Sequence, residues 1–203
     1  MEAEAYVALT ARYETPLFSY AARMLGGLAD GEQCLVAALA AGFGDLVGGA
    51  EPARPQEWFA AVVREACFDE LARRGAGVSA EDDLDGTGDC VATAADATLA
   101  ALRPAYRDLL QLRDVLGLDG ALLAAVTDMS DADLQHQLYR ARSEFASAFA
   151  GLPAPASCPA RRSDCPDCAE RELLRATPQR ALLHLAPLPV RDQVRDALRT
   201  AIA

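Results

Sequence analysis

The chain contains no lysine, and its nineteen arginines face thirty aspartates and glutamates, which gives a formal net charge of −11 at pH 7. A protein that grips nucleic acid mainly through its phosphates carries a basic surface. The overall charge therefore disfavours tight DNA binding, although a local basic patch could still form. The absence of lysine also excludes a lysine nucleophile or a Schiff base.

Common signatures of catalysis are missing as well. The sequence has no Gly-x-Gly-x-x-Gly motif and no phosphate-binding loop. Its two histidines, His136 and His184, lie far apart in the sequence and give little support for a His-based triad or a His-Glu-x-x-His site. The carboxylates between residues 81 and 85 could bind a cation, but a solvated acidic run explains them better. We predict that the protein is not an enzyme.

Long apolar runs are absent too. No stretch of eighteen apolar residues is present to cross a membrane. The start of the chain, Met1-Glu2-Ala3-Glu4, lacks the basic residues with which a signal peptide begins. We therefore expect a cytoplasmic protein that does not contact membranes.

Alanine and leucine are abundant, in a chain that is 52% hydrophobic and only 6% aromatic, and this composition favours helices over strands. Apolar residues recur at helical spacing in residues 5–25, 30–43, 56–74, 131–150 and 190–202. Residues 75–96 are rich in glycine and acidic residues and predict a flexible linker. We predict an all-α fold with a helical domain at 1–74, this linker at 75–96, a second helical domain at 97–150, and a proline-rich, cysteine-containing C-terminal appendage at 151–203.

Several breaks in the helical pattern are expected. Pro16 predicts a kink or a break in the first helix, Pro104 predicts another, and Asp30 is the expected N-cap of the second helix. A short helix at 121–126, a turn at 127–130 and a helix at 131–150 have the shape of a helix-turn-helix.

Two blocks of sequence carry a recognisable family pattern. The first contains the stretch from Gly31 to Phe43 and the run Trp58-Phe59…Arg64-Glu65…Asp69-Glu70-Leu71-Ala72-Arg73-Arg74. The second contains Leu99…Leu102-Arg103-Pro104…Leu110-Gln111-Leu112 and Leu138-Tyr139-Arg140-Ala141-Arg142. In this order they resemble the RNA polymerase sigma factors of the extracytoplasmic-function (ECF) type. The first block resembles the domain that binds polymerase and reads the −10 promoter element, and the second resembles the helix-turn-helix that reads the −35 element.

The resemblance implies a transcription regulator whose partners are core RNA polymerase, promoter DNA or an anti-sigma factor. It assigns polymerase or partner binding to the start of the second helix, at Glu32, Gln33, Leu35 and Val36. It assigns DNA binding to the helix-turn-helix and to the end of the first domain, at Gln135, His136, Gln137, Arg140, Arg142, Arg73 and Arg74.

The chain departs from the family at positions that carry this chemistry. Asp133, Gln135 and Gln137 stand where the family offers threonine, lysine and arginine, so cationic contacts to DNA are lost. Two interpretations remain open. The protein is either a divergent sigma factor that binds polymerase or promoter DNA with weakened DNA-reading residues, or a degenerate sigma-like adaptor. Such an adaptor would bind an anti-sigma factor or another regulator without reading promoters.

A cysteine cluster lies near the C-terminus. Cys165 and Cys168 form a Cys-x2-Cys motif, a spacing that allows two thiolates to bind one zinc ion, and Cys158 and His184 would complete a structural Cys3His site. This tail resembles a zinc-binding anti-sigma-like module, although Arg161 stands at the position of that module's histidine. The alternative is a set of reduced, redox-sensitive thiols. The scattered cysteines Cys34, Cys67 and Cys90 are predicted to be small core residues.

Overall fold

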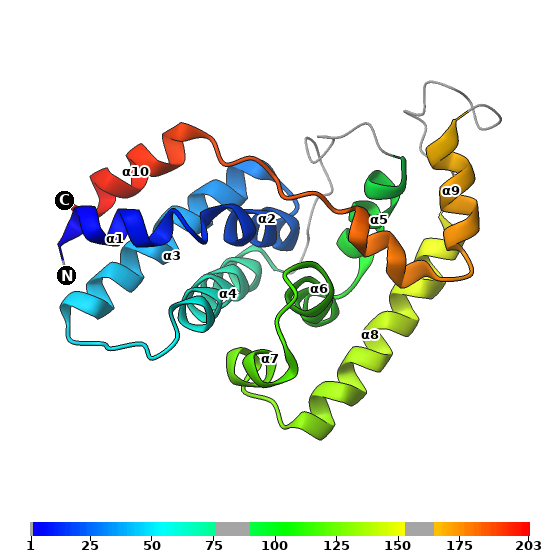
Figure 1. Ribbon diagram of the computed structural model, residues 1–203, viewed down its shortest axis with the longest axis horizontal. Helices are drawn as coiled ribbons and strands as arrows, with labels where there is room; N and C mark the ends of the chain where they lie inside the picture. Colours follow the sequence, from blue (N-terminus) through cyan, green and yellow to red (C-terminus); the bar gives the residue numbers. More distant parts are fainter. Residues whose placement is uncertain (1, 76–89, 153–164) are drawn as a thin grey trace. The chain divides into compact units, whose positions relative to one another are not determined.

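The computed structural model describes residues 2–75, 90–152 and 165–203. Within these ranges all regular secondary structure is helical and no strand occurs, which confirms the predicted all-α class (Figure 1). None of the described helices is both long and apolar enough to cross a membrane. The chain divides into two compact units: unit 1 is Met1–Ser79, Ala124–Asp128 and Pro187–Ala203, and unit 2 is Ala80–Leu123 and Met129–Ala186.

The helices of unit 1 come from both ends of the chain. They are α1 (Ala3–Thr10), α2 (Glu14–Leu25), α3 (Leu28–Val47), α4 (Pro55–Arg74) and α10 (Asp192–Ile202). The helix predicted at 5–25 is therefore two helices, and Pro16 lies in the first turn of α2, where a missing N–H is tolerated. Gly27, not Asp30, is the N-cap of α3, and Asp30 lies inside its first turn.

Aromatic contacts and one close helix approach organise the core of unit 1. The Tyr6 ring lies 5.1 Å from the Phe43 ring and 6.0 Å from the Phe59 ring, and its hydroxyl donates to the Leu39 carbonyl at 2.7 Å. A Cβ atom at Gly31 would lie 2.6 Å from the Cα of Ala22. Glycine is therefore required at this close approach of α3 to α2.

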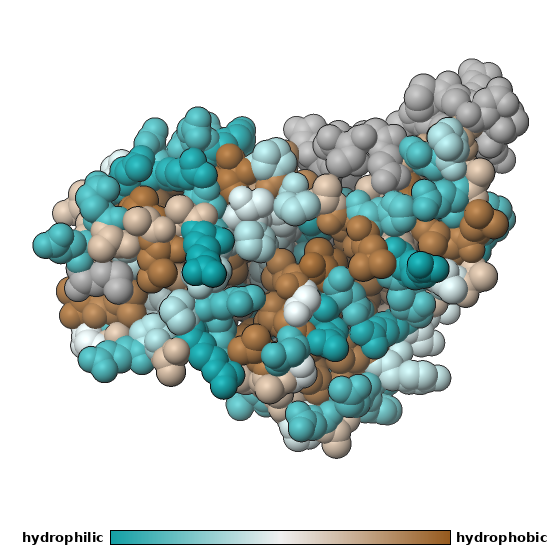
Figure 2. Space-filling model, viewed as in Figure 1, coloured by the Kyte–Doolittle hydropathy of each residue, from teal (hydrophilic) through white to brown (hydrophobic). Residues whose placement is uncertain are grey.

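The C-terminal helix α10 packs against α1 and α3, so the two ends of the sequence lie side by side (Figure 1). Val194 and Leu198 are buried against these helices, whereas hydrophilic side chains gather on the outer side of α10 (Figure 2). The prediction that residues 151–203 form a single appendage is therefore wrong. Its last residues complete unit 1, and residues 165–186 belong to unit 2.

Unit 2 has a separate apolar core. Its helices are α5 (Cys90–Ala101), α6 (Pro104–Leu110), the π-helical turn η1 (Gln111–Val115), α8 (Asp131–Gly151), α9 (Pro166–Leu174) and the 3₁₀ helix η2 (Pro178–His184). Leu99 of α5, Phe145 and Phe149 of α8, and Leu182 of η2 meet in this core. The linker prediction fails at residues 90–96, which form the start of α5, with Val91 and Ala95 fully buried. The rest of the predicted acidic stretch, 76–89, lies outside the described residues.

A buried arginine fixes the turn between α5 and α6. Arg107 is 2% exposed and donates to the carbonyls of Leu99, Ala100 and Leu102 at 3.0, 2.7 and 3.0 Å. The last carbonyls of a helix have no partner within the helix, so the guanidinium satisfies them. Pro104 begins α6, as expected of a break at this position.

The predicted helix-turn-helix corresponds to α7 (Gly120–Thr127), a short turn and α8. Asp128 adopts the left-handed conformation with φ of 53°. Ser130 is the N-cap of α8, and its hydroxyl accepts a hydrogen bond from the backbone N–H of Asp133. Helix α7 is itself divided, because its last residues belong to unit 1 and its first residues to unit 2.

Candidate functional site

The outward face of α8 carries three of the seven residues predicted to contact DNA. Gln135, His136 and Arg140 are exposed, and Tyr139 joins them with 74% of its surface accessible. Leu134 and Leu138, on the inward face of α8, are buried. The exposed face is therefore a polar and aromatic stripe, and Gln137, which is half-buried, lies at its edge.

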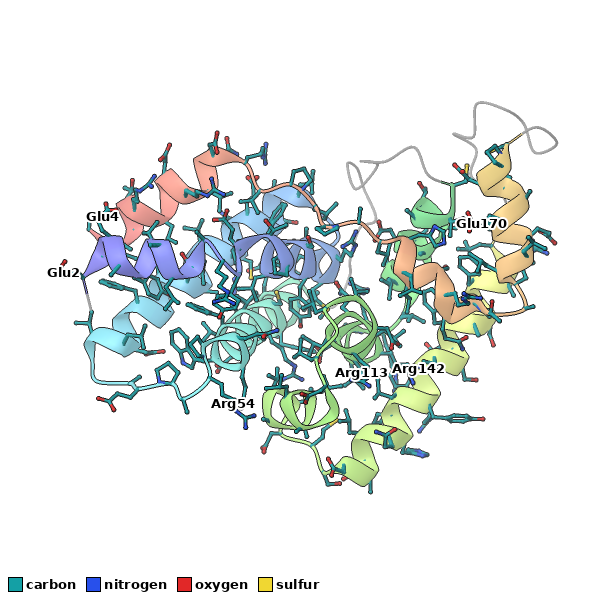
Figure 3. All side chains as sticks on the ribbon, in the orientation of Figure 1. Glu2, Glu4, Arg54, Arg113, Arg142 and Glu170 are labelled. Carbon is teal, nitrogen blue, oxygen red and sulfur yellow. The ribbon has the colours of Figure 1, made fainter. Side chains whose placement is uncertain are left out.

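Arg142 faces η1 and not solvent alone (Figure 3). Its Nε and NH2 atoms donate to the two carboxylate oxygens of Asp114 at 3.1 and 2.5 Å. This hydrogen bonding raises the pKa of Arg142 above its ordinary value, with burial acting in the opposite direction. Arg142, which was predicted to contact DNA, thus forms a bidentate ion pair with Asp114 within unit 2.

The first turn of α8 is acidic and capped by its own side chains. Ser130 donates its hydroxyl proton to the Asp133 carboxylate at 2.6 Å while accepting from the Asp133 backbone N–H at 3.2 Å. This reciprocal cap stabilises the helix start. Asp131 and Asp133 both lie in this turn, where negative charge suits the helix dipole but repels a phosphate.

The arginines at the end of α4 are also paired. Arg73 and Arg74 both donate to Glu70, and Arg74 also donates to Asp30 at 2.5 Å. The hydrogen bond from Arg74 lowers the pKa of Asp30 below its usual value, whereas desolvation opposes this shift. These two predicted DNA contacts lie in unit 1, whereas the α8 residues lie in unit 2.

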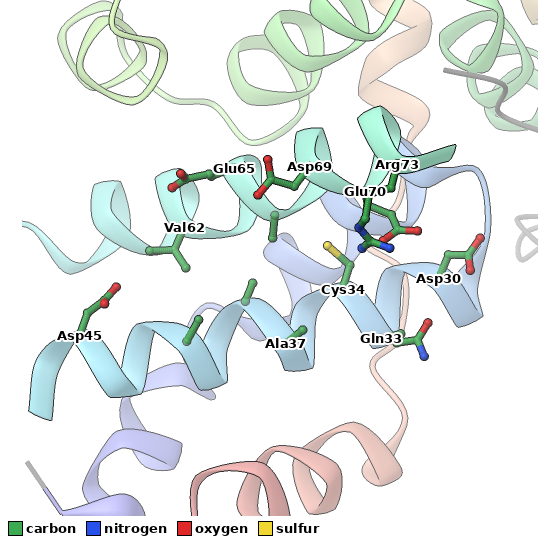
Figure 4. Close-up of a pocket in the computed structure, with 13 residues that line it drawn as sticks. Asp30, Gln33, Cys34, Ala37, Asp45, Val62, Glu65, Asp69, Glu70 and Arg73 are labelled. Atoms are coloured by element: carbon green, nitrogen blue, oxygen red, sulfur yellow. The ribbon is translucent and has the colours of Figure 1, made fainter. Parts of the chain in front are cut away.

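A groove with a volume of about 600 Å³ runs between α3 and α4 (Figure 4). Its floor is made of small side chains such as Ala37 and Ala66. Its rims are acidic, with a single arginine, and the charged residues are Asp30, Asp45, Glu65, Asp69, Glu70 and Arg73. The groove therefore presents an apolar floor between carboxylates.

The four residues predicted to bind polymerase or another partner do not form one surface. Gln33 is exposed and lines the groove, and Val36 is half-buried. Leu35 has no exposed surface, so it belongs to the core and cannot contact a partner in this fold. Glu32 is 8% exposed and accepts hydrogen bonds from Arg191, the N-cap of α10, and from Gln193 in its first turn.

Three cysteine sulfurs of unit 2 gather in one place. The Sγ atoms of Cys90, Cys165 and Cys168 all lie within 4.8 Å of one another, and such a group could hold a metal ion. Of the ligand set predicted from the sequence, Cys165 and Cys168 are therefore together. Cys158 lies outside the described residues, and His184 lies 3.7 Å from the Glu170 carboxylate and is not part of the cluster.

Cys90 was not predicted to be a metal ligand, because it was grouped with the core cysteines. It is separated from Cys165 by 75 positions, so no spacing motif could connect the two. One signal was present. Cys34 and Cys67 sit in apolar helical stretches, whereas Cys90 follows the acidic run directly. A buried pair does form between Cys34 and Cys67, whose sulfurs lie 3.6 Å apart.

No protein-family model matches this chain, and comparison with curated proteins gives no match.

Proposed function

We propose that the protein is a sigma-factor-like regulator of transcription that acts through protein–protein contacts and does not read promoter DNA by itself. The observation that carries this proposal is the pairing of three of the four arginines predicted to contact DNA. Arg73, Arg74 and Arg142 are each bound to a carboxylate of their own unit. Phosphates would have to displace those carboxylates before these arginines could contribute to binding.

The charges at the end of α4 and on α8 favour the adaptor over a sigma factor that reads promoter DNA. DNA affinity rises with each phosphate that a cation neutralises, because condensed counterions are then released. An arginine that is already neutralised by Glu70 or Asp114 supplies little of this free energy. The acidic start of α8, with Asp131 and Asp133, works against approach to the backbone.

The groove between α3 and α4 is the surface that we assign to the partner. Its carboxylate rims and alanine floor suit a basic, amphipathic helix of another protein, which would place apolar side chains on the floor and cations at the rims. Gln33 lies in this groove, so one residue of the predicted partner surface is retained there. Unit 2, taken by itself, has an exposed aromatic side chain at Tyr139, of the kind that anchors protein interfaces.

One observation favours a second function, weakened promoter reading as part of a polymerase complex. His136 and Arg140 lie one turn apart on the exposed face of α8, and neither forms an ion pair with any residue in the described ranges. They could contact base edges or phosphates once polymerase brings α8 to the DNA. This function requires polymerase to supply most of the binding free energy.

The test is a pull-down of the purified chain with core RNA polymerase, followed by measurement of promoter-DNA binding by fluorescence anisotropy at two salt concentrations. We expect no promoter binding by the chain alone. Salt-dependent, sequence-specific binding by the isolated chain would contradict the proposal. Promoter binding only after polymerase is added would favour the second function instead.

A pair of variants tests the partner surface. Asp69→Arg reverses one rim charge of the groove, and Glu4→Arg makes the same change on α1, outside the groove. We expect the first variant alone to lose the captured protein, whether this is polymerase or another regulator. Equal retention by both variants would show that the groove is not the contact surface.

A further inference from the structure

We infer that Cys90, Cys165 and Cys168 form a structural zinc site that ties the start of α5 to the start of α9. The site differs from the set predicted from the sequence, because Cys90 takes part and His184 does not. Its three ligands come from two segments of unit 2 on either side of the helix-turn-helix. The inference does not depend on the proposed function.

The spacing of the sulfur atoms fits a zinc ion. Zinc–thiolate bonds are about 2.3 Å long, so two sulfurs at the corners of a tetrahedron lie about 3.8 Å apart. The sulfurs of Cys90 and Cys165 are 3.9 Å apart, and all three sulfurs lie within 4.8 Å of one another. Only a small adjustment would therefore bring the three thiolates into the coordination distance of one ion.

Two helix N-termini lie at the cluster. Cys90 is the first residue of α5, Cys165 is the N-cap of α9, and Cys168 lies in the first turn of α9. Helix N-termini carry unpaired N–H groups and the positive end of the helix dipole, which favour negative charge nearby. Two helix ends thus point their positive ends toward the same three sulfurs.

A buried arginine supplies the charge that such a site needs. Three thiolates and one Zn²⁺ carry a net charge of −1. Arg171 follows Cys168 by one turn of α9 and is only 3% exposed. Its NH2 group donates to the Leu152 carbonyl, whereas its Nε has no hydrogen-bond partner among the described residues. Burying this guanidinium is costly unless negative charge lies nearby, and the ionised cluster supplies that charge.

The thiolate ligands favour zinc, and the burial of the site favours a structural role. Cys90 is 4% exposed and Cys165 is 8% exposed, and thiolates prefer zinc over the oxygen-seeking cations Mg²⁺ and Ca²⁺. Cys168 is half-buried, so two of the three ligands are shielded from solvent, which suits a site that stabilises a fold. Zinc would fix the beginning of α9 on α5, in addition to the apolar contacts of Leu174 and Leu182 with the unit 2 core.

The first experiment uses the full-length chain, purified under reducing conditions. Zinc content is measured by mass spectrometry, and the metal-free protein is titrated with Co²⁺. We expect one zinc ion per chain and the near-ultraviolet sulfur-to-cobalt charge-transfer band of a tetrahedral thiolate site. Absence of both from the folded wild-type protein would overturn the inference, as would a disulfide between these cysteines as the stable state under reducing conditions.

Variants then assign the ligands. Cys90→Ser should weaken Co²⁺ binding by more than about 100-fold, since loss of even an outer partner of a metal site costs about 10- to 100-fold. Cys34→Ser is the matched control, because Cys34 is also buried beside another cysteine but in unit 1. It should leave binding unchanged, and so should His184→Gln. Full affinity in Cys90→Ser, or loss in His184→Gln, would refute this ligand set.

Two further variants distinguish loss of a ligand from a general folding defect. Arg171→Met removes the compensating charge but no ligand, so we expect weaker binding by about tenfold with an unchanged charge-transfer band. Cys90→His replaces one zinc ligand by another and should restore binding relative to Cys90→Ser. If Cys90→His binds no better than Cys90→Ser, Cys90 is not a ligand.

Discussion

Each unit includes a segment from the C-terminal part of the chain, and the two segments are held by different interactions. Helix α10 belongs to unit 1, and α9 and η2 belong to unit 2. In unit 1, arginines that belong to or precede α10 reach carboxylates near the start of the chain: Arg195 binds Glu14, and Arg191 binds Glu32. In unit 2, α9 and η2 are joined to α5 and α8 by apolar packing and by the sulfur cluster. The first attachment depends on charge at the rim of an apolar contact. The second depends on contacts that salt does not weaken.

This difference bears on which surface of each unit can respond to a partner. Glu32 was predicted to bind a partner, and in the structure it is occupied by Arg191 and Gln193. A partner reaches Glu32 only if that end of α10 moves. The groove between α3 and α4, in contrast, is open without any such movement.

The largest expected effects come from the apolar anchors. Leu198→Ala should destabilise unit 1, and Leu182→Ala should destabilise unit 2, each by about 2–5 kcal/mol, because each removes a side chain that is at least 96% buried. Hydrogen exchange followed by mass spectrometry would locate the loss of protection. Leu183→Ala is the control, since Leu183 is 74% exposed and its loss should change stability by less than about 0.5 kcal/mol. Equal loss of protection in both units from either variant would show that the two attachments are not separate.

A smaller effect is expected from the charged rim of unit 1. Arg195→Met leaves the carboxylate of Glu14, which is 5% exposed, without its cation, so the melting temperature of unit 1 should fall. The double variant Arg195→Met with Glu14→Met should recover part of the loss, because it removes the stranded charge as well. Arg199→Met breaks only the exposed pair with Asp196 and should have little effect. No difference between the Arg195 and Arg199 variants would mean that charge does not hold α10.

In unit 2, the ion pair with Asp114 should restrain Arg142 from binding phosphate. Asp114→Asn should release Arg142 to solvent and steepen the salt dependence of nonspecific DNA binding by about 0.9 in log–log slope, the contribution of one phosphate contact. Glu144→Gln is the matched control, because it removes the same charge from the exposed face of α8 without freeing an arginine. Anisotropy titrations over a range of salt concentrations would measure both slopes. Identical slopes would show that pairing with Asp114 does not restrain Arg142.

The helices could be predicted from the sequence because helical periodicity and chain breaks are local properties. The break at Pro104 and the long helix that begins at Asp131 both correspond to observed elements. The all-α class followed from the same signals. Within the first domain, the helix predicted at 5–25 is two helices, and Gly27 takes the N-cap place of α3 that was expected for Asp30.

The partners of the site residues could not be predicted, because they are distant in sequence. Glu14 and Arg195 are 181 positions apart, and Cys90 and Cys165 are 75 apart. Nothing in the local pattern distinguishes a glutamate that is buried under α10 from one on an open face. The same limit applies to Arg142. It was predicted from the sequence to contact DNA, whereas in the structure it donates a hydrogen bond to Asp114.

The smallest expected effect concerns the arginines at the end of α4. Arg74 lowers the pKa of Asp30, so this carboxylate is more acidic in the folded protein than in the unfolded chain. A carboxyl group whose pKa is lowered by folding stabilises the fold at pH values above its pKa in the unfolded chain, which is about 3.9. This contribution is lost as the pH falls through the pKa of the group in the folded protein. The pair is partly exposed, with side-chain accessibilities of 32% and 39%, so we expect less than about 1 kcal/mol.

Thermal unfolding of wild type and Asp30→Asn, compared at pH 7 and near pH 3, would measure this contribution. The variant should be slightly less stable at pH 7, and the difference should shrink as the carboxylate of the wild type becomes protonated. A difference that stays constant with pH would mean that the ionised form of Asp30 does not stabilise the fold. In that case Arg74 would be only loosely held by Asp30, and Glu70 alone would restrain it from binding DNA.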